Sequence, residues 1–97
     1  MLLWHATPYS NLTSIVDNGL ITSNGKIFFA DKVESAVLFV YMKGEKHIVA
    51  FPVDFTEEEV KESFDHNIDF FKCRCFSVTN NIPYSRIIEK DIIKYEL

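Results

Sequence analysis

The fold is decided by residues 23–44, which read SNGKIFFADKVESAVLFVYMKG. Residues 23–25 have the composition of a turn, and residues 26–30 form a short apolar run that predicts a buried strand. Asp31 and Glu34 follow in the D-x-x-E spacing of a capping box, so we expect a helix to begin there. A strand followed at once by a helix indicates a domain that mixes both kinds of element.

Apolar residues recur with helical spacing through the second half of this stretch. One face of the expected helix carries Val33, Ala36, Val37, Val40 and Tyr41. The i, i+3, i+4, i+7, i+8 series places these side chains on one stripe, which a helix buries against a core. Gly44 follows and predicts the end of the helix.

The preceding sequence predicts another strand and another helix. Residues 2–5 read as the start of an apolar strand. Thr7 can cap a helix whose first position is Pro8. Gly19 is expected to end that helix in a left-handed conformation, with Leu20 making the hydrophobic contact beyond it.

The following sequence predicts three strands and a short helix. Residues 47–53 read as a strand, in which Pro52 indicates a sheet edge or a strand end. Thr56 and Glu59 have capping-box spacing and predict a short helix that continues to Phe64. The last strands are expected at residues 70–78 and 86–97, on either side of a turn at 80–81. This order of elements predicts an α+β fold with a mixed sheet.

Length and composition indicate one domain, spanning residues 1–97. The chain has 97 residues, of which 47% are hydrophobic, enough for one core and too few for two. Ten basic residues against 14 acidic ones give a net charge of −4. This balance argues against strong non-specific binding to nucleic acid, although a local basic patch is compatible with it.

Targeting and cysteine patterns predict a cytoplasmic protein. No apolar run approaches the roughly 18–20 residues of a membrane span, and the N-terminus lacks the features of a secretory signal, so no membrane partner is expected. Cys73 and Cys75 are spaced C-x-C, which on an extended segment is too strained for an ordinary disulfide. Reduced thiols favour the cytoplasm. We interpret them as buried strand thiols rather than zinc ligands, and expect no metal.

Common catalytic motifs are absent, which directs attention to His5. The sequence contains no glycine-rich phosphate loop, no H-E-x-x-H and no G-x-S-x-G. His5 follows an apolar strand and should project at its end, where ligand-binding groups are often placed. Taken alone, His5 is better interpreted as a structural or surface histidine, and its sequence neighbours change that interpretation.

Four short motifs occur in order along the first half of the chain. They are Leu2-Leu3-Trp4-His5-Ala6-Thr7, Asn11-Leu12-x-x-Ile15-x-x-x-Gly19-Leu20, Gly25-Lys26-Ile27-Phe28-Phe29-Ala30-Asp31 and Ser35-Ala36. Together they resemble the first half of the poly(ADP-ribose) polymerase catalytic domain, whose motifs read L-W-H-G-S/T, I-L-x-x-G-L, G-K-G-I-Y-F-A-D and S-A. The resemblance covers about residues 2–40 and extends to the wider ADP-ribosyltransferase superfamily.

The resemblance implies a minimal ADP-ribosyltransferase-like fold with NAD as cofactor. This fold is α+β, with a split mixed or antiparallel sheet and two to three short helices, and NAD lies across the split. In this family the motif histidine hydrogen-bonds the adenosine ribose, and the backbone of the next residue holds the nicotinamide amide. The implied NAD contacts are His5, Ala6, Thr7, Phe28 and Ser35.

Three of these contacts depart from the family pattern. Ala6 replaces the usual glycine, and the backbone groups survive this change. Phe28 stands where the family has a tyrosine that stacks on nicotinamide, so it keeps the ring face and loses the hydroxyl. Ser35 matches the serine that binds the carboxamide only after a shift of one residue.

The family's catalytic glutamate has no counterpart in this sequence. The matching stretch runs from Lys72 to Pro83 and contains no acidic residue. A carboxylate from elsewhere is needed to stabilise the positive charge that develops on the ribose as the glycosidic bond breaks. We expect Asp65 in this role rather than Asp54, because Asp65 adjoins a second titratable group, His66. The alternative is that this pair forms a surface helix end.

Three interpretations of function follow. The first is an NAD-dependent ADP-ribosyltransferase that modifies a protein, nucleic acid or small molecule, with His5, Asp65 and His66 as catalytic residues. The second is an inactive member of the same fold that binds a nucleotide or a protein, such as a small phage or bacterial inhibitor. The third is an α+β domain whose core happens to contain these motifs. A homodimer is also expected as one option, because a domain this small and apolar can expose an apolar patch.

Overall fold

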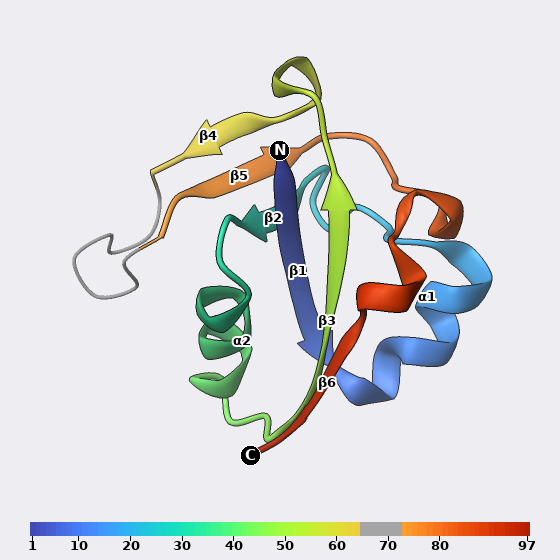
Figure 1. The fold of residues 1–97 in the computed structure, drawn as a ribbon, viewed down its shortest axis with the longest axis vertical. Helices are drawn as coiled ribbons and strands as arrows, with labels where there is room; N and C mark the ends of the chain where they lie inside the picture. The colour runs from blue at the N-terminus through green and yellow to red at the C-terminus, as the bar shows by residue number, and fades with distance from the viewer. Residues whose placement is uncertain (65–72) are drawn as a thin grey trace.

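The computed structural model describes residues 1–64 and 73–97. The described residues form a six-stranded sheet and two α-helices, arranged as in Figure 1. The strands are β1 (Leu2–Pro8), β2 (Ile27–Ala30), β3 (His47–Asp54), β4 (Lys61–Ser63), β5 (Cys75–Val78) and β6 (Ile93–Glu96), and the helices are α1 (Leu12–Asn18) and α2 (Val33–Tyr41). The strand order is β4-β5-β2-β1-β3-β6, and every pair is antiparallel. The α+β class is therefore confirmed, whereas the expected mixed sheet is wrong for the described strands, whose pairs are all antiparallel.

The sheet consists of two three-stranded halves. All seven residues of β1 pair with β3, and all four residues of β2 pair with β5. Between β1 and β2, by contrast, the register joins Trp4 to Ala30 alone among the described residues. Figure 1 shows the consequence, because β4, β5 and β2 run across the direction of β1 and β3.

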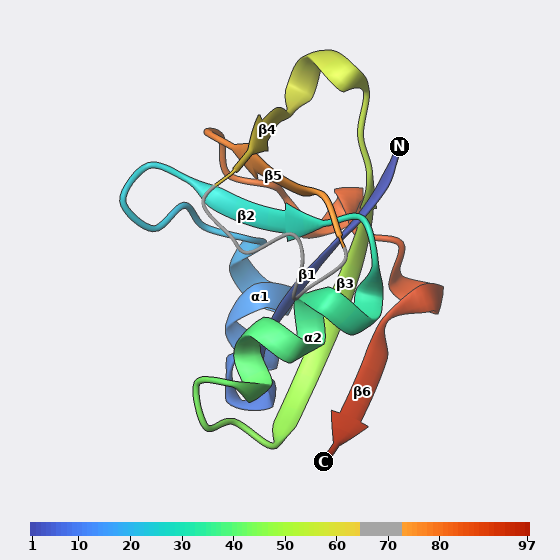
Figure 2. The ribbon, with the colours of Figure 1, turned by 90° about the vertical axis from the view of Figure 1, so that its left-hand side faces the viewer.

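The two helices cover opposite faces of β3, because side chains alternate along a strand. Val49, Phe51 and Val53 belong to a core cluster that includes Ile15 of α1. Ile48 and Ala50 pack with α2 residues instead. In Figure 2, α2 lies in front of β1 and β3. The sheet is thus buried on both sides near its centre, which explains why β3 is almost continuously apolar.

The first helix begins later than the sequence predicts. Strand β1 continues through Thr7 and Pro8, which pair with Val49 and Ile48 of β3. A short 3-10 turn (Tyr9–Asn11) follows before α1 starts at Leu12. The prediction that Thr7 caps the helix at Pro8 is therefore wrong. Pairing with a buried strand outweighs a local capping signal, which is worth only about 1 kcal/mol.

Helix α2 forms where expected, but Asp31 does not cap it. The helix begins at Val33, after Lys32, which makes no side-chain cap bond. The Asp31 carboxylate instead accepts a hydrogen bond from the backbone N–H of Arg74 at 2.9 Å, and its own N–H donates to the Arg74 carbonyl at 3.0 Å. Asp31 thus ties the end of β2 to the segment before β5. The buried stripe includes Ala36, Val37 and Val40, whereas Tyr41 is 44% exposed.

Pro52 lies inside the sheet rather than on an edge strand. Strand β3 runs between β1 and β6, and Pro52 is fully buried. Its carbonyl accepts a hydrogen bond from the N–H of Ile88 at 3.0 Å. Because the nitrogen and oxygen of a strand residue point to the same side, the missing N–H of Pro52 faces away from β1. The expectation of an edge strand is wrong. The missing N–H of Pro52 removes no backbone hydrogen bond between β3 and β1.

The C-terminal half contains more short turns than the sequence predicts. The capping box forms, since the Glu59 carboxylate accepts hydrogen bonds from the N–H and the hydroxyl of Thr56. This capping box begins a 3-10 turn (Glu57–Glu59) and not an α-helix, and β4 follows it directly. The helix predicted to reach Phe64 is therefore absent from the described residues. Two more 3-10 turns (Tyr84–Arg86 and Glu89–Asp91) interrupt the first part of the predicted 86–97 strand, of which β6 keeps Ile93–Glu96. Of the predicted 70–78 strand, β5 is observed, and residues 70–72 lie outside the described residues.

The described helices are also short relative to a lipid bilayer. None of them is long and apolar enough to cross a membrane.

Gly19 is required where α1 ends. Its φ is +75°, as the sequence predicts, but its ψ of −168° is not the left-handed helical value. The chain leaves the helix extended, and Leu20 and Ile82 exchange backbone hydrogen bonds of 2.8 and 2.9 Å. A Cβ at Gly19 would lie 2.3 Å from the Ile82 carbonyl oxygen. The positive φ and this close backbone approach together exclude a side chain.

We therefore predict that Gly19→Ala destabilises the protein by about 2–4 kcal/mol, through backbone strain plus a steric clash. The matched control is Gly25→Ala, because Gly25 has a φ of +81° and nothing within 4 Å of an added Cβ. It should cost only the strain, about 1–2 kcal/mol. Denaturant unfolding of both variants measures the difference. Equal losses in the two variants would show that the approach to Ile82 is unimportant.

Candidate functional site

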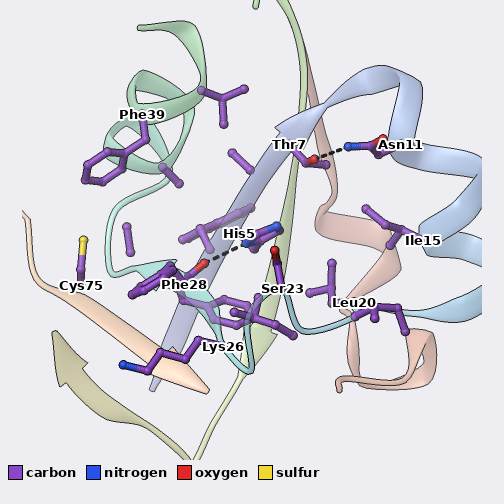
Figure 3. A pocket seen from close by; sticks show the side chains of 18 of the residues that line it. His5, Thr7, Asn11, Ile15, Leu20, Ser23, Lys26, Phe28, Phe39 and Cys75 are labelled. Carbon is purple, nitrogen blue, oxygen red and sulfur yellow. Dashed lines mark hydrogen bonds between the residues drawn. The ribbon is translucent and has the colours of Figure 1, made fainter. Parts of the chain in front are cut away.

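A cleft of about 910 Å³ opens where the two halves of the sheet diverge. Its walls come from β1, β2, α1, α2 and the segment between α1 and β2. His5 and Phe28 both line it, so the imidazole and the phenyl ring lie at one cleft. Figure 3 shows His5 near the centre, with Phe39 and Cys75 on one side and Thr7 and Asn11 on the other.

His5 connects the two halves of the sheet through its side chain. Its Nδ1 lies 2.8 Å from the backbone carbonyl oxygen of Phe28, drawn as a dashed line in Figure 3. A carbonyl can only accept, so Nδ1 carries the proton and donates. In the neutral ring Nε2 is then an acceptor. The ring also packs against that of Phe29, with centroids 5.6 Å apart.

The surroundings of His5 favour its neutral form. Burial lowers the pKa of the imidazole below its ordinary value of 6.5, and the Lys43 ammonium lowers it further. The hydrogen bond to the Phe28 carbonyl opposes this shift but does not reverse it. At neutral pH the cleft therefore contains an imidazole whose Nε2 can accept a hydrogen bond from a hydroxyl.

Phe28 exposes an aromatic ring to the cleft because of its position in β2. Its neighbours Ile27 and Phe29 are 4% and 2% exposed, whereas Phe28 is 49% exposed. Strand alternation buries the neighbours in the core and leaves the ring of Phe28 outside it. An exposed aromatic ring beside a cleft can stack on a planar group such as a base.

The other residues predicted to contact NAD are placed differently from one another. Ala6 and Thr7 line the cleft with His5. The Thr7 hydroxyl accepts a hydrogen bond from the Asn11 amide at 2.8 Å, so it is already engaged. Ser35 is buried on α2 and is not among the cleft-lining residues.

The predicted acidic residues are not brought into the described part of the cleft. Asp65 and His66 lie outside the described residues. Asp54, the second candidate, lies at the end of β3 and pairs with the N-terminal amino group at 3.2 Å, away from the cleft lining. Ser63, two residues before Asp65, does line the cleft.

The charged side chains that line the described cleft are lysines. Lys26 and Lys43 contribute to its wall, and no aspartate or glutamate among the described residues does so. The chain has a net charge of −4, so this is a local reversal of the overall sign. Such a lining favours an anionic ligand.

Sequence reasoning did not identify Phe39, Lys26 or Lys43 as part of the site. Phe39 is an apolar residue that does not belong to the buried stripe of α2. An apolar side chain outside that stripe could have indicated a second contact surface on the helix. Lys43 enters the cleft because α2 ends beside β1. Its role depends on the packing of α2 against the sheet, which no local pattern encodes.

Cys73 and Cys75 are buried thiols that form no disulfide with each other, as predicted. Their sulfur atoms lie 3.9 Å apart, and Cys75 also lines the cleft. Burial, with the neighbouring Cys73, raises the pKa of the Cys75 thiol to about 12. Cys75 is therefore a protonated, weakly nucleophilic thiol at neutral pH. The described residues contain no group of three or more His, Cys, Asp or Glu side chains that could hold a metal ion.

Comparison with known proteins does not assign this chain to a family. No protein-family model matches the chain, and a search of curated proteins finds no match.

The lowered pKa of His5 predicts a pH dependence of stability. The unfolded chain binds a proton to this ring near pH 6.5, whereas the folded protein binds it only at lower pH. The contribution of neutral His5 is therefore complete above pH 6.5 and is lost as the pH falls through the folded pKa. Denaturant unfolding between pH 7.5 and 5 should show this loss, and NMR titration should place the His5 midpoint below 6.5.

The control for this prediction is His5→Asn, whose side-chain amide can still donate to the Phe28 carbonyl but does not titrate. This variant should lose less stability than the wild type over the same pH range. A His5 midpoint above 6.5, or identical pH profiles for the two proteins, would contradict the assignment of a neutral, desolvated ring.

Proposed function

We propose that this chain is an ADP-ribosyltransferase-like domain that binds NAD, or its ADP-ribose part, in the cleft between β1 and β2. The observation that carries the proposal is the pairing of His5 with Phe28 at the point where the two halves of the sheet separate. These are the two residues that the resemblance to poly(ADP-ribose) polymerases assigns to the ribose and to the nicotinamide ring.

The chemistry of the cleft fits a dinucleotide at three points. His5 Nε2 is available to accept a hydrogen bond from a ribose hydroxyl. The half-exposed ring of Phe28 offers a stacking face to a planar base. Lys26 and Lys43 supply positive charge for a diphosphate. The cleft volume of about 910 Å³ is within the range of small-molecule sites.

Calorimetric titration with NAD and with ADP-ribose tests this proposal. Both ligands should bind the wild type, and Phe28→Leu should weaken binding by about tenfold or more, because it removes a stacking face worth on the order of 1–3 kcal/mol. His5→Ala should also weaken binding. Tyr41→Leu is the matched control, since Tyr41 is a comparably exposed aromatic residue outside the cleft. Absence of binding at millimolar ligand, or equal effects of Phe28→Leu and Tyr41→Leu, would reject the proposal.

Catalysis is a second candidate function for the same cleft. In ADP-ribosyl transfer the bond between nicotinamide and ribose C1′ breaks, nicotinamide leaves with the bonding electrons, and a nucleophile on the acceptor attacks C1′. The positive charge that develops on the ribose requires a nearby carboxylate. Ser63 brings the chain to the cleft two residues before Asp65, and this observation favours Asp65 as the carboxylate over Asp54.

Release of nicotinamide from NAD distinguishes an enzyme from a binding domain. If the protein is a transferase, Asp65→Asn should lower the rate by about 10²–10³-fold while NAD binding persists. Asp54→Asn should have no comparable effect, because Asp54 pairs with the N-terminal amino group outside the cleft. A protein that binds NAD but releases no nicotinamide, with or without added cell lysate, would be a binding domain only.

A further inference from the structure

Strand β6 forms one border of the sheet. It pairs with β3 through His47–Ala50, and no other described strand pairs with its outer side. Figure 2 shows β6 at the edge of the molecule, beyond β3. An open strand edge presents unpaired backbone groups that can bind another strand.

The backbone hydrogen bonds show which residues of β6 face outward. The N–H of Leu97 donates to the carbonyl of Lys46 at 2.8 Å, so the residue pair Leu97–Lys46 is a hydrogen-bonded pair of the antiparallel ladder. Such pairs alternate along a strand. Tyr95 therefore directs its N–H and C=O to β3, as Leu97 does, whereas Lys94 and Glu96 direct theirs to the open side.

The charges of these two residues select one register for self-pairing. Two antiparallel copies of β6 can place Lys94 opposite Lys94, Glu96 opposite Glu96, or Lys94 opposite Glu96. Only the last arrangement avoids like charges across the strands, which destabilise a pair. It also lets the N–H and C=O groups of both residues, in both copies, bond across the new edge.

The same register matches apolar residues on the other face of the strand. It centres Tyr95 on Tyr95 and places Ile93 opposite Leu97. Ile93 and Leu97 are 36% and 57% exposed, so they have surface to bury. Tyr95 and Leu97 also border a groove of about 220 Å³ against α2, which includes the exposed Tyr41. A two-fold axis normal to the sheet and midway between the two Tyr95 residues would bring α2 of both copies to the same face, over this groove.

We propose that the chain forms a two-fold homodimer by antiparallel pairing of β6 with β6 of a second copy, with Lys94 opposite Glu96. An interface built on one short strand belongs to the small size class, at or below about 1,200 Å², so the association is micromolar rather than nanomolar. The proposal is independent of the nucleotide proposal, because the cleft lies between β1 and β2 and stays open in this dimer.

Charge reversal tests the register. Lys94→Glu places glutamates opposite each other and Glu96→Lys places lysines opposite each other, so each variant should dimerise at least about tenfold more weakly by sedimentation equilibrium. A mixture of the two variants should recover a heterodimer, since each strand then faces opposite charges. Lys90→Glu, a nearby change of the same charge, is the control and should dimerise like the wild type.

Hydrogen exchange gives a second readout that does not depend on the variants. The amides of Lys94 and Glu96 should become protected as the wild-type concentration rises, whereas Leu97, already bonded to Lys46, should change little. Circular dichroism must show that both variants fold, because Lys94 also lies over the Tyr9 ring and Glu96 pairs with His47. A wild type that stays monomeric near 1 mM would overturn the proposal. So would a dimer that persists in both single variants, or a mixture that fails to associate.

Discussion

The hydrogen bond from the His5 imidazole to the Phe28 carbonyl spans the line along which the two halves of the sheet meet. Backbone pairing between β1 and β2 is confined to Trp4 and Ala30 in the part of the chain described, so a side chain continues the connection that the backbone leaves incomplete. This constraint fixes the tautomer of His5, leaves Nε2 as an acceptor and holds the strand that carries Phe28. The geometry of the cleft and the stability of the sheet therefore depend on the same imidazole.

The charged residues that line the described cleft differ in sign from the net charge of the chain. Acidic residues outnumber basic ones over the whole chain, yet the charged side chains of the described cleft wall are lysines. Acidic groups are used on the surface to connect segments instead. Glu59 accepts hydrogen bonds from the Arg86 guanidinium, and this contact lowers its pKa to about 2. Glu62 binds Arg74 in the same way. The cleft remains accessible to an anionic ligand because these carboxylates are directed elsewhere.

Sequence patterns predicted buried elements better than their boundaries. The apolar run around Phe51 becomes a strand buried on both faces, whereas the run around Phe29 becomes a strand with Phe28 exposed on one face. The apolar stripe of α2 becomes a helix because it packs against the sheet. Capping signals were less reliable. Thr7 extends a strand and Asp31 bonds to Arg74, because partners distant in sequence offer these groups stronger pairing than a helix end. In the cleft, His5 and Phe28 were identified through their motifs. Lys43 and Phe39 were not, since their positions depend on how α2 packs.

The order of strands in the sheet has a consequence for how the chain reaches its native state. Strand β1 comes first in the chain yet lies between β2 and β3, and its complete partner, β3, ends at Asp54. During synthesis β1 must therefore wait until the chain has emerged through Asp54 before it can complete its ladder with β3. Topologies dominated by such distant pairings fold on the order of milliseconds to seconds. Until β3 arrives, an apolar segment remains open to chaperones.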